Sequence, residues 1–475
     1  MKINCVYDFI SPKGPIPNGF HLKYIDKLWE YDYDINNSEF IDDYYKEDVI
    51  NVKQSLLLLG IKSANISTND LVLNDGYVLR KNELYFYNIC SSGNIFSTLS
   101  LRQFSKNPHI LSYVSDKLKE LLNNSNNLYI IIEYIMEGQI DMNVIDSIYL
   151  HCKFNNIPTD KIIFVSSVFN IDKIHEKYCS LYPQDKKIKT AFYNWAIPFK
   201  SHELEHALNI KNTDSELYVK NSISKNIFSS SEFDIKEKKA LLLNRRLRLH
   251  RLILLSMLAE DDYLKDTLSS FDLSMDSFPN FYNWIDGEYF QKSKMFNNSE
   301  YVNKSKNGYL KIKQINKKTI DYDSLHDVIG YGYESGDIYK KTYFSIVTET
   351  EFFEESHFLS EKSIKPLMHL HPFVIVGSPY SLKLLKSYGF KTFSNWWDES
   401  YDSMENTNDR IIAIYNLILS LLKKTDDEWV IMIKEMREIL IHNRKLLLKY
   451  NPESINKIIS NNFVDVIFNN KQILF

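Results

Sequence analysis

The sequence predicts an α/β protein of two domains, each built on a sheet of mostly parallel strands. The chain has 475 residues, which is too long for one ordinary hydrophobic core. Strand-like and helix-like segments alternate from Leu128 onwards and again from Ala240 onwards, a pattern typical of parallel sheets. A long helical pattern from Asn408 to Leu448 follows the second alternation.

The composition is that of an ordinary globular protein, with 44% hydrophobic and 25% charged residues. The net charge of −4 provides no global field that would favour nucleic acid. The N-terminal residues lack the apolar core of a signal peptide, and no apolar run reaches the roughly 18 to 20 residues of a membrane span. We therefore expect a cytoplasmic protein. The four widely spaced cysteines, Cys5, Cys90, Cys152 and Cys179, are expected to be buried free thiols.

We assign residues 1–215 to the first domain. It begins with a strand-like run, Ile3 to Ile10, which ends in a loop rich in proline and glycine. The clear alternation comes later in this domain. Strands are predicted at Leu128–Ile132 and Ile162–Val168, and helices at Val144–Phe154 and Asp172–Tyr178.

A polar stretch, residues 212–231, is interpreted as a linker to a second domain over residues 236–403. That domain has strands at Ala240–Leu243, Tyr343–Val347, Phe373–Val376 and Gly389–Phe393, and helices at His250–Leu258, from Ser360 onwards and at Leu382–Ser387. Residues 261–335 are rich in Asp, Ser, Asn and Tyr and are expected to be an irregular insertion. Residues 404–475 are expected to be helices that pack across the domains, with Asp426 as a helix N-cap.

Polar residues follow the strands of the second domain where a ligand is expected. Glu349 and the pair Gly377 and Ser378 stand at the ends of two strands, and Glu361, Lys362 and Lys365 stand on the helix between them. Ligands of such units bind at the carboxyl ends of strands and the amino ends of helices. A carboxylate there accepts hydrogen bonds from ribose hydroxyls, and a lysine neutralises a phosphate. An ordinary exposed ion pair is the alternative for Glu361 and Lys362.

An arginine cluster lies between a strand and a helix start. Its members are Arg245, Arg246, Arg248 and Arg251. Guanidinium groups bind phosphate oxygens in pairs, and a helix N-terminus adds a favourable dipole. The cluster therefore suits a diphosphate. A solvated basic face, pairing with carboxylates, or single-stranded nucleic acid are the other interpretations.

The first domain offers two candidates for a general base. Glu133 and Glu137 flank a strand end, with Gly138 allowing a turn. Surface carboxylates without a catalytic role occupy similar places, so both remain candidates.

Several other patterns are weaker. His202 to His206 fits HExxH, but the segment is short and polar, and an exposed charged helix explains it better than a zinc site. The DxD pairs Asp32/Asp34 and Asp321/Asp323 are expected by chance in a chain so rich in Asp, and we predict no metal site. The absence of GxxxxGK[ST], GxGxxG and GxSxG motifs disfavours a P-loop kinase, a dehydrogenase or a serine hydrolase.

The C-terminal domain resembles that of the α-1,3-fucosyltransferases, and more loosely exostosin-like enzymes and the glycosyltransferase-like proteins of phages and giant viruses. That domain carries Glu-Asn-Ser/Thr at a strand end, then Thr-Glu-Lys, then an apolar strand closing on Gly-Ser/Ala-Pro. Here Glu349-Thr350, Ser360-Glu361-Lys362 and Gly377-Ser378-Pro379 stand in that order. Asn244 and Arg251 match an upstream Asn and Arg. Ser360 replaces Thr and Thr350 replaces Asn, and the resemblance covers about residues 236–400.

The resemblance implies a GT-B fold, in which two Rossmann-like domains face a cleft, and a metal-independent, inverting glycosyltransferase. It implies that a nucleotide-sugar, GDP-linked rather than UDP-linked by preference, binds to the Glu-Lys pair and the arginine. A carboxylate of the first domain would activate a hydroxyl of a glycan or other acceptor. Transfer to viral nucleic acid and a non-catalytic interaction protein of the same fold stay open as alternatives.

Overall fold

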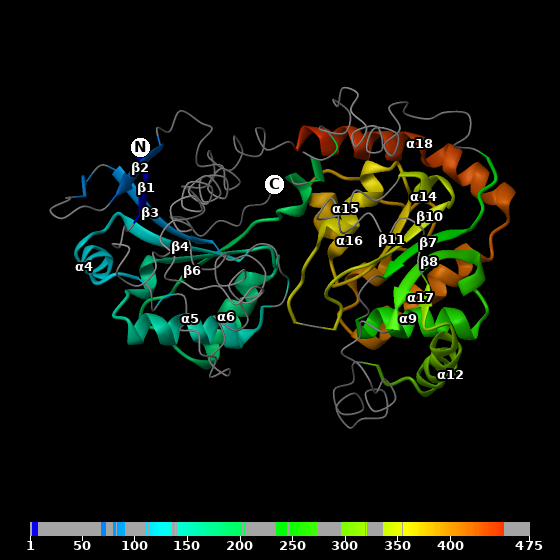
Figure 1. Ribbon diagram of the computed structural model, residues 1–475, viewed down its shortest axis with the longest axis horizontal. Coiled ribbons are helices and arrows are strands. Elements are labelled where there is room, and N and C mark those ends of the chain that lie inside the picture. Colours follow the sequence, from blue (N-terminus) through cyan, green and yellow to red (C-terminus); the bar gives the residue numbers. More distant parts are fainter. Residues whose placement is uncertain are drawn as a thin grey trace, which may run out of the picture. The chain divides into compact units, whose positions relative to one another are not determined.

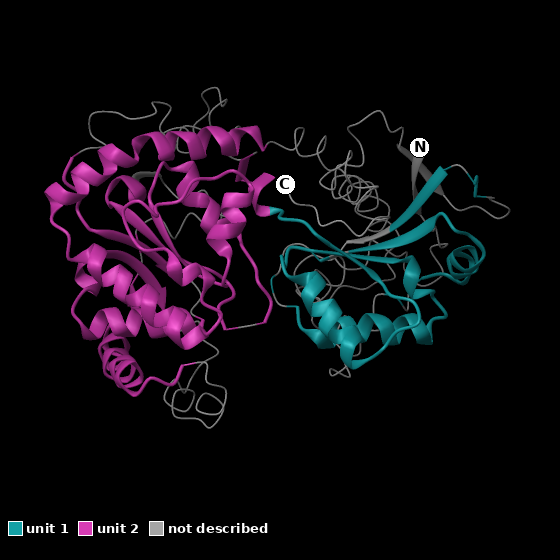
Figure 2. Ribbon diagram, turned by 180° about the vertical axis from the view of Figure 1, so that it is seen from behind, with its two compact units in different colours: residues 1–195, 452–475 teal, residues 196–451 magenta. Residues whose placement is uncertain are grey.

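The computed structural model describes residues 2–7, 68–72, 79–90, 111–204, 234–273, 296–320 and 336–450, with short gaps inside these ranges at residues 82, 112–113, 135–137, 139, 199, 202–203, 245–247, 319 and 354. The chain divides into two compact units (Figure 2). Unit 1 comprises residues 1–195 and 452–475, and unit 2 comprises residues 196–451. Among the described residues, no helix is long and apolar enough to cross a membrane.

Unit 1 is built on a parallel sheet with the strand order β2-β1-β3-β4-β5-β6. The strands are β1 (Lys2–Tyr7), β2 (Thr68–Val72), β3 (Glu83–Cys90), β4 (Leu128–Tyr134), β5 (Ile162–Ser166) and β6 (Lys189–Phe192). Its helices are α4 (Asp116–Asn124), α5 (Met142–Phe154) and α6 (Ile171–Leu181). The β-branched strands β4 and β5 are buried, as expected for a parallel sheet covered by helices. Cys152 and Cys179 are buried free thiols, as predicted for these two positions.

Unit 2 has a second sheet, in the order β11-β10-β7-β8-β9, in which only β9 is antiparallel to its neighbour. The strands are β7 (Ala240–Asn244), β8 (Thr267–Asp272), β9 (Lys317–Lys318), β10 (Phe344–Thr348) and β11 (Phe373–Val376). The helices are α9 (Leu249–Glu260), α12 (Ser299–Ile315), α14 (Gly336–Lys340), α15 (Glu361–Met368), α16 (Ser381–Ser387), α17 (Thr407–Leu422) and α18 (Asp426–Lys449). In Figure 1, α18 runs along one side of this sheet and α9 and α12 along the other.

The prediction of an α/β chain with two parallel-sheet domains is therefore confirmed. In unit 2 the chain passes from β7 to β8 on one side and later to β10 on the other side of β7. The direction of winding thus reverses between β7 and β10. Such a switch point, at the carboxyl ends of the two strands, is where ligands bind in open α/β sheets.

The expectation of an irregular insertion over residues 261–335 is wrong for the residues described. β8 pairs with β7 inside the sheet, and α12 packs closely against α9. The close packing depends on Gly308, because a Cβ at this position would lie 1.7 Å from the backbone oxygen of Ser256. The helix was not predicted from the sequence because much of α12 is exposed and its residues are therefore mostly polar.

Two smaller predictions are wrong, one about a strand and one about a helix cap. No strand forms at Gly389–Phe393, because the backbone N–H of Lys391 bonds to Asn443 Oδ1 and that of Phe393 bonds to Glu399 Oε1. The N-cap of α18 is Thr425, one residue before the predicted Asp426. Thr425 and Glu428 form a capping box.

The helices of residues 404–450 belong to unit 2, which differs from the predicted separate segment 404–475. Trp429 of α18 is fully buried and stacks on Tyr343 and Phe344 at centroid distances of 5.5 and 5.0 Å. These contacts hold α18 against unit 2 near the start of β10. They also add buried apolar surface to the core of unit 2.

Candidate functional site

The site lies at the switch point of unit 2, where Asn244 ends β7 and Thr348 ends β10. The Thr348 hydroxyl donates to Asn244 Oδ1 at 2.5 Å, so the two strand ends are joined directly. Asn244 is completely buried, and within the described part of the chain its Nδ2 has no hydrogen-bond partner. A buried amide donor without a partner is costly, and each such group in a native structure calls for an explanation. A bound ligand would supply the missing acceptor.

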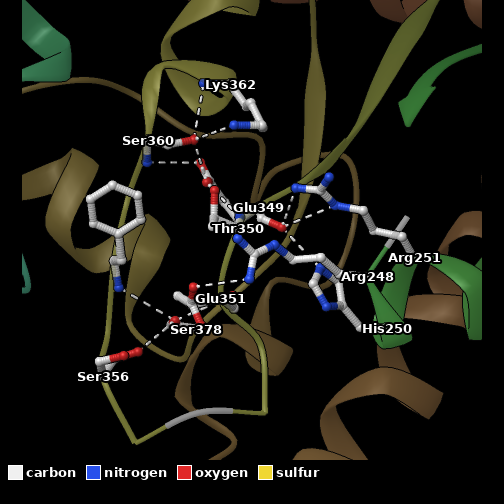
Figure 3. A network of polar contacts seen from close by, with 11 residues as sticks. Arg248, His250, Arg251, Glu349, Thr350, Glu351, Ser356, Ser360, Lys362 and Ser378 are labelled. Carbon is white, nitrogen blue, oxygen red and sulfur yellow. Dashed lines mark hydrogen bonds and ion pairs between the residues drawn. The ribbon is translucent and has the colours of Figure 1, made fainter. Parts of the chain in front are cut away.

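Glu349 follows Thr348 and is the centre of the network in Figure 3. Its side chain is inaccessible to solvent. The carboxylate accepts hydrogen bonds from the Ser360 backbone N–H at 3.1 Å, the Ser360 hydroxyl at 2.6 Å, and the Ser363 hydroxyl at 2.5 Å. It also accepts from the backbone N–H of Thr350 at 3.2 Å. Glu349 therefore anchors the first turn of α15 to the end of β10, and its oxygens are already occupied by protein donors.

The backbone oxygen of Glu349 is a second anchor point. It accepts from His250 Nε2 at 2.9 Å and from Arg251 Nη2 at 2.8 Å (Figure 3). Burial first, and then the neighbouring Arg251, lower the pKa of His250 well below its usual value, so the ring is neutral and its Nε2 carries the proton. Burial and the nearby Arg248 lower the pKa of Arg251 to about 10, which leaves the guanidinium charged.

Arg251 is thus directed inward, with only 4% of its surface exposed. Arg248 is different, because a third of its side chain is exposed and its Nη1 lies 3.5 Å from Oε1 of the buried Glu351. The structure therefore pairs Arg248 with a carboxylate, which was one of the alternatives for the arginine cluster. Arg245 and Arg246 lie outside the described residues.

Glu361 and Lys362 form the solvent-facing rim at the amino end of α15. Lys362 Nζ lies 2.9 Å from Glu361 Oε1, and their side chains are 33% and 25% exposed. Burial alone would raise the pKa of Glu361, but Lys362 and Lys365 outweigh it and lower this pKa to about 2. Glu361 is therefore an ionised carboxylate at neutral pH that is surrounded by lysines and partly exposed to solvent.

Gly377 and Ser378 have packing roles in this geometry. A Cβ on Gly377 would lie 3.0 Å from Cβ and 3.1 Å from Cγ of Glu349, so the glycine leaves room for that side chain. The buried Ser378 hydroxyl lies 3.4 Å from the backbone oxygens of Glu351 and Ser356 and orders the acidic loop between them. Neither residue reaches the solvent-facing rim.

The structure thus brings seven of the predicted site residues of unit 2 into one connected region. They are Asn244, Arg248, Arg251, Glu349, Glu361, Lys362 and Gly377, and Lys365 stands on the same helix. Glu133 has its backbone at the carboxyl end of β4, paired with Val165, while its side chain and all of Glu137 lie outside the described part. The HExxH and DxD patterns also lie outside the described residues, apart from single positions.

Sequence reasoning missed Lys200, Glu351 and Ser363. Lys200 is buried in unit 2 and is near enough to Glu361 to help lower its pKa, after Lys362 and Lys365. The sequence gives no signal for Lys200, because this residue is 161 positions before Glu361 in the chain and belongs to no motif. Ser363 had a detectable signal, since it lies one helical turn after Ser360 on the face that meets Glu349.

No family model matches this sequence, and no curated protein matches it. Among the solved structures that match the chain, three are described here, and all three are only weakly similar to it. A putative UDP-N-acetylglucosamine 2-epimerase from Listeria monocytogenes has a TM-score of 0.31 and 10% identity, over 99% of this chain and 98% of that one. An apo structure of OtsA has a TM-score of 0.36 and 9% identity, over 98% and 99%.

The third is a glycosyltransferase from Rickettsia africae, with a TM-score of 0.31 and 16% identity over 80% of this chain and 91% of that one. At these TM-scores the similarity carries no weight for fold or function. The α/β architecture described above therefore stands on the sheets and helices of the chain itself.

Proposed function

We propose that this chain is a glycosyltransferase of the GT-B type whose unit 2 binds a nucleotide-sugar. The observation that carries the proposal is the switch point of its parallel sheet. There a buried amide without a partner, Asn244 Nδ2, is linked through Thr348 and Glu349 to a charged, solvent-facing rim. Open α/β sheets bind nucleotides at this place.

The rim supplies the two kinds of group that a nucleoside diphosphate requires. Glu361 is ionised and partly exposed, so it is a better acceptor for ribose hydroxyls than the fully occupied Glu349. Lys362 and Arg248 are the partly exposed cations for the phosphates, and the amino end of α15 adds its dipole. Arg251 contributes positive charge from the buried side of the rim, because its guanidinium donates a hydrogen bond to the backbone oxygen of Glu349.

Transfer would proceed by attack of an acceptor hydroxyl on the anomeric carbon. A carboxylate of unit 1, with Glu133 and Glu137 as candidates, would take the hydroxyl proton. The bond from the anomeric carbon to the diphosphate oxygen breaks, and the cations of the rim stabilise the charge on the departing nucleoside diphosphate. On this proposal the reaction inverts the anomeric centre and requires no metal ion. A GDP-sugar is the preferred donor and a UDP-sugar the second choice.

The proposal is tested by a thermal-shift panel of GDP, UDP, CDP and their sugars on the full chain. We expect one nucleotide to raise the melting temperature, and the increase to disappear in Lys362→Ala and in Glu361→Gln. Lys391→Ala, which removes an exposed lysine elsewhere in unit 2, is the matched control and should keep the full shift.

A wild-type protein that responds to none of these nucleotides would contradict the proposal and favour a non-catalytic interaction protein. A shift that persists unchanged in Lys362→Ala and Glu361→Gln would place nucleotide binding elsewhere on the chain.

A further inference from the structure

A buried arginine at the start of α17 joins two loops at the carboxyl edge of the unit 2 sheet. This residue, Arg410, is 1% exposed. Its Nη2 donates a hydrogen bond to the backbone oxygen of Phe352 at 2.7 Å, in the loop after β10. Its Nη1 donates to the backbone oxygens of Met404 at 2.7 Å and Glu405 at 3.3 Å, just before α17. The rigid fork of one guanidinium therefore fixes the loop after β10 relative to residues 404–405.

The segment before α17 is itself bound to the residues that follow β11. The Asp402 carboxylate accepts hydrogen bonds from the backbone N–H groups of Leu382 at 2.8 Å and Lys383 at 2.9 Å. The backbone oxygen of Asp402 accepts from the N–H of Tyr380 at 2.6 Å. These three donors belong to the start of α16, which follows β11. Since β10 and β11 are neighbours in the sheet, Arg410 connects the loops after two adjacent strands.

The Phe352 side chain extends this connection to the buried residues of the candidate site. The guanidinium carbon of Arg410 lies 4.5 Å from the centre of the Phe352 ring. That ring stacks on the imidazole of His250, with the two centroids 5.4 Å apart. His250 Nε2 in turn donates to the backbone oxygen of Glu349 at 2.9 Å (Figure 3). A continuous series of contacts therefore runs from Arg410 to the residue that anchors α15.

The same loop carries the partner of a rim cation. Glu351, the residue before Phe352, is inaccessible to solvent, and its Oε1 lies 3.5 Å from Nη1 of Arg248. Because adjacent Cα atoms are only about 3.8 Å apart, a displacement of Phe352 also moves Glu351. The hydrogen bond from Arg410 to the Phe352 backbone oxygen therefore helps to determine where the Arg248 guanidinium lies.

Stability alone is a weak reason for an arginine at this position. Burial lowers the pKa of Arg410 to about 10, so its guanidinium remains charged at neutral pH. Within the described part of the chain, this group donates to backbone oxygens and not to a carboxylate. Withdrawing a charge from water costs free energy, and a buried charge is weak evidence for a gain in stability. Orienting a functional loop is a stronger reason for the charge.

We propose that Arg410 is a positioning residue for nucleotide binding, which holds the loop after β10 so that Glu351 directs Arg248 towards the phosphates. The inference rests on the function proposed above and adds to it a residue that touches no ligand. The effect of Arg410 on nucleotide affinity should therefore pass through Arg248. This requirement separates a positioning role from a general contribution to the stability of unit 2.

The experiment is calorimetric titration of the full chain with GDP, UDP and CDP in turn. For the nucleotide that binds the wild type, we expect the affinity of Arg410→Met to be weaker by on the order of tenfold. Tyr415→Phe is the matched control on the same helix. It removes a buried hydroxyl whose hydrogen bond to the backbone oxygen of Met257 lies at the opposite end of α9 from Arg251. This variant should bind as tightly as the wild type, even if its melting temperature falls.

The variant Arg248→Met provides the background that tests the route of the effect. Adding Arg410→Met to Arg248→Met should weaken the affinity by less than about twofold, because the cation that Arg410 positions is already absent. A loss of affinity that came from general destabilisation would instead be the same in both backgrounds.

Hydrogen exchange measures the loop without any ligand. The backbone amides of residues 350–353 should exchange faster in Arg410→Met than in the wild type, and at the wild-type rate in Tyr415→Phe. If Arg410→Met does not fold, Arg410→Lys takes its place, because a single ammonium group keeps the charge but lacks the fork that bridges Phe352 and Met404. We expect changes in the same direction for the lysine variant.

The possible failures are distinguishable. A wild type that binds none of the three nucleotides would contradict the proposed function itself, and with it this role of Arg410. With a wild type that binds, the role of Arg410 alone is overturned by wild-type affinity or unchanged loop exchange in the Arg410 variant. It is also overturned if Tyr415→Phe weakens binding as much, or if the effects of Arg248→Met and Arg410→Met on affinity are additive.

Discussion

Two carboxylates at the switch point of unit 2 have opposite surroundings, although both stand where a strand end meets a helix start. Glu349 is inaccessible to solvent, and its oxygens accept hydrogen bonds from Ser360 and Ser363. Glu361 is a quarter exposed and faces Lys362 and Lys365. The difference teaches that an acidic residue in a ligand motif can stabilise the fold, and that the residue available to a ligand is the one that is partly exposed and has charged partners.

The largest expected effect is the loss of stability on removing the Glu349 side chain. Glu349→Ala leaves the buried donors of Ser360 and Ser363 without an acceptor, which should cost about 3 kcal/mol or more of unfolding free energy. Urea denaturation of this variant beside Glu361→Ala checks the comparison, since Glu361 is partly exposed on the rim and its loss should cost less than the loss of Glu349. Equal costs for the two variants would contradict the roles assigned here.

The next effect concerns the space reserved for Glu349. Gly377→Ala places a methyl group 3.0 Å from Glu349 Cβ, and overpacking of this kind costs about 1 to 3 kcal/mol. The midpoint of urea denaturation should fall accordingly. In the double variant Gly377→Ala/Glu349→Ala the 3.1 Å contact with Cγ is removed and the contact with Cβ stays, so part of the overpacking is relieved and the combined cost should be less than the sum of the two separate costs. Strict additivity would show that Gly377 does not act through Glu349.

A smaller effect is expected for one of the hydrogen bonds to Glu349. Ser363→Ala removes the 2.5 Å bond to Oε1, while Ser360 still satisfies the carboxylate. We expect a loss of about 1.5 kcal/mol by the same denaturation measurement, because a hydrogen bond to a charged group is worth more than a neutral one. Ser387→Ala, an exposed serine of α16, serves as the control and should change stability by less than about 0.5 kcal/mol.

The smallest expected effect is a dependence on pH that distinguishes Glu361 from a neutral residue. The pKa of Glu361 is lowered from 4.5 to about 2, because Lys362 and Lys365 outweigh the opposing effect of burial. A lowered pKa contributes stability above the unfolded value, and this contribution is lost as the pH falls from 4.5 towards 2. The difference in unfolding free energy between wild type and Glu361→Gln should therefore favour the wild type above pH 4.5 and vanish near pH 2. A difference that does not change over this range would contradict the cationic surrounding of Glu361.

Much of unit 2 was predictable from the sequence because its strands are short, β-branched and bounded by polar residues. Phe373–Val376 was predicted with the bounds that the structure has, and Ala240–Leu243 within one residue. The α12 helix was not predictable, because its buried face is a glycine and a few small or apolar residues that touch α9. A strand at Gly389–Phe393 was predicted from apolar residues, and its failure depends on Asn443, a partner more than fifty residues away.

The location of the site was predictable from the sequence, but the role of each of its residues was not. The order of Glu349, Glu361 and Gly377 in the chain locates the carboxyl edge of the sheet. The sequence alone cannot say which carboxylate is satisfied, because that depends on where the hydroxyl of Ser363 and the ammonium of Lys200 come to lie. The unpaired Nδ2 of Asn244 is likewise recognised only in the structure, where the Thr348 hydroxyl donates a hydrogen bond to Oδ1 of the same side chain and Nδ2 has no partner among the described residues.

The most direct test of the central claim, that the Glu361-Lys362 turn holds the nucleotide of a donor, is a calorimetric titration. The nucleotide selected by the thermal-shift panel is titrated into the wild type, Lys362→Ala and Lys391→Ala. The account predicts an affinity on the order of ten- to a hundredfold weaker for Lys362→Ala than for the other two proteins. Equal affinities for Lys362→Ala and Lys391→Ala would contradict it.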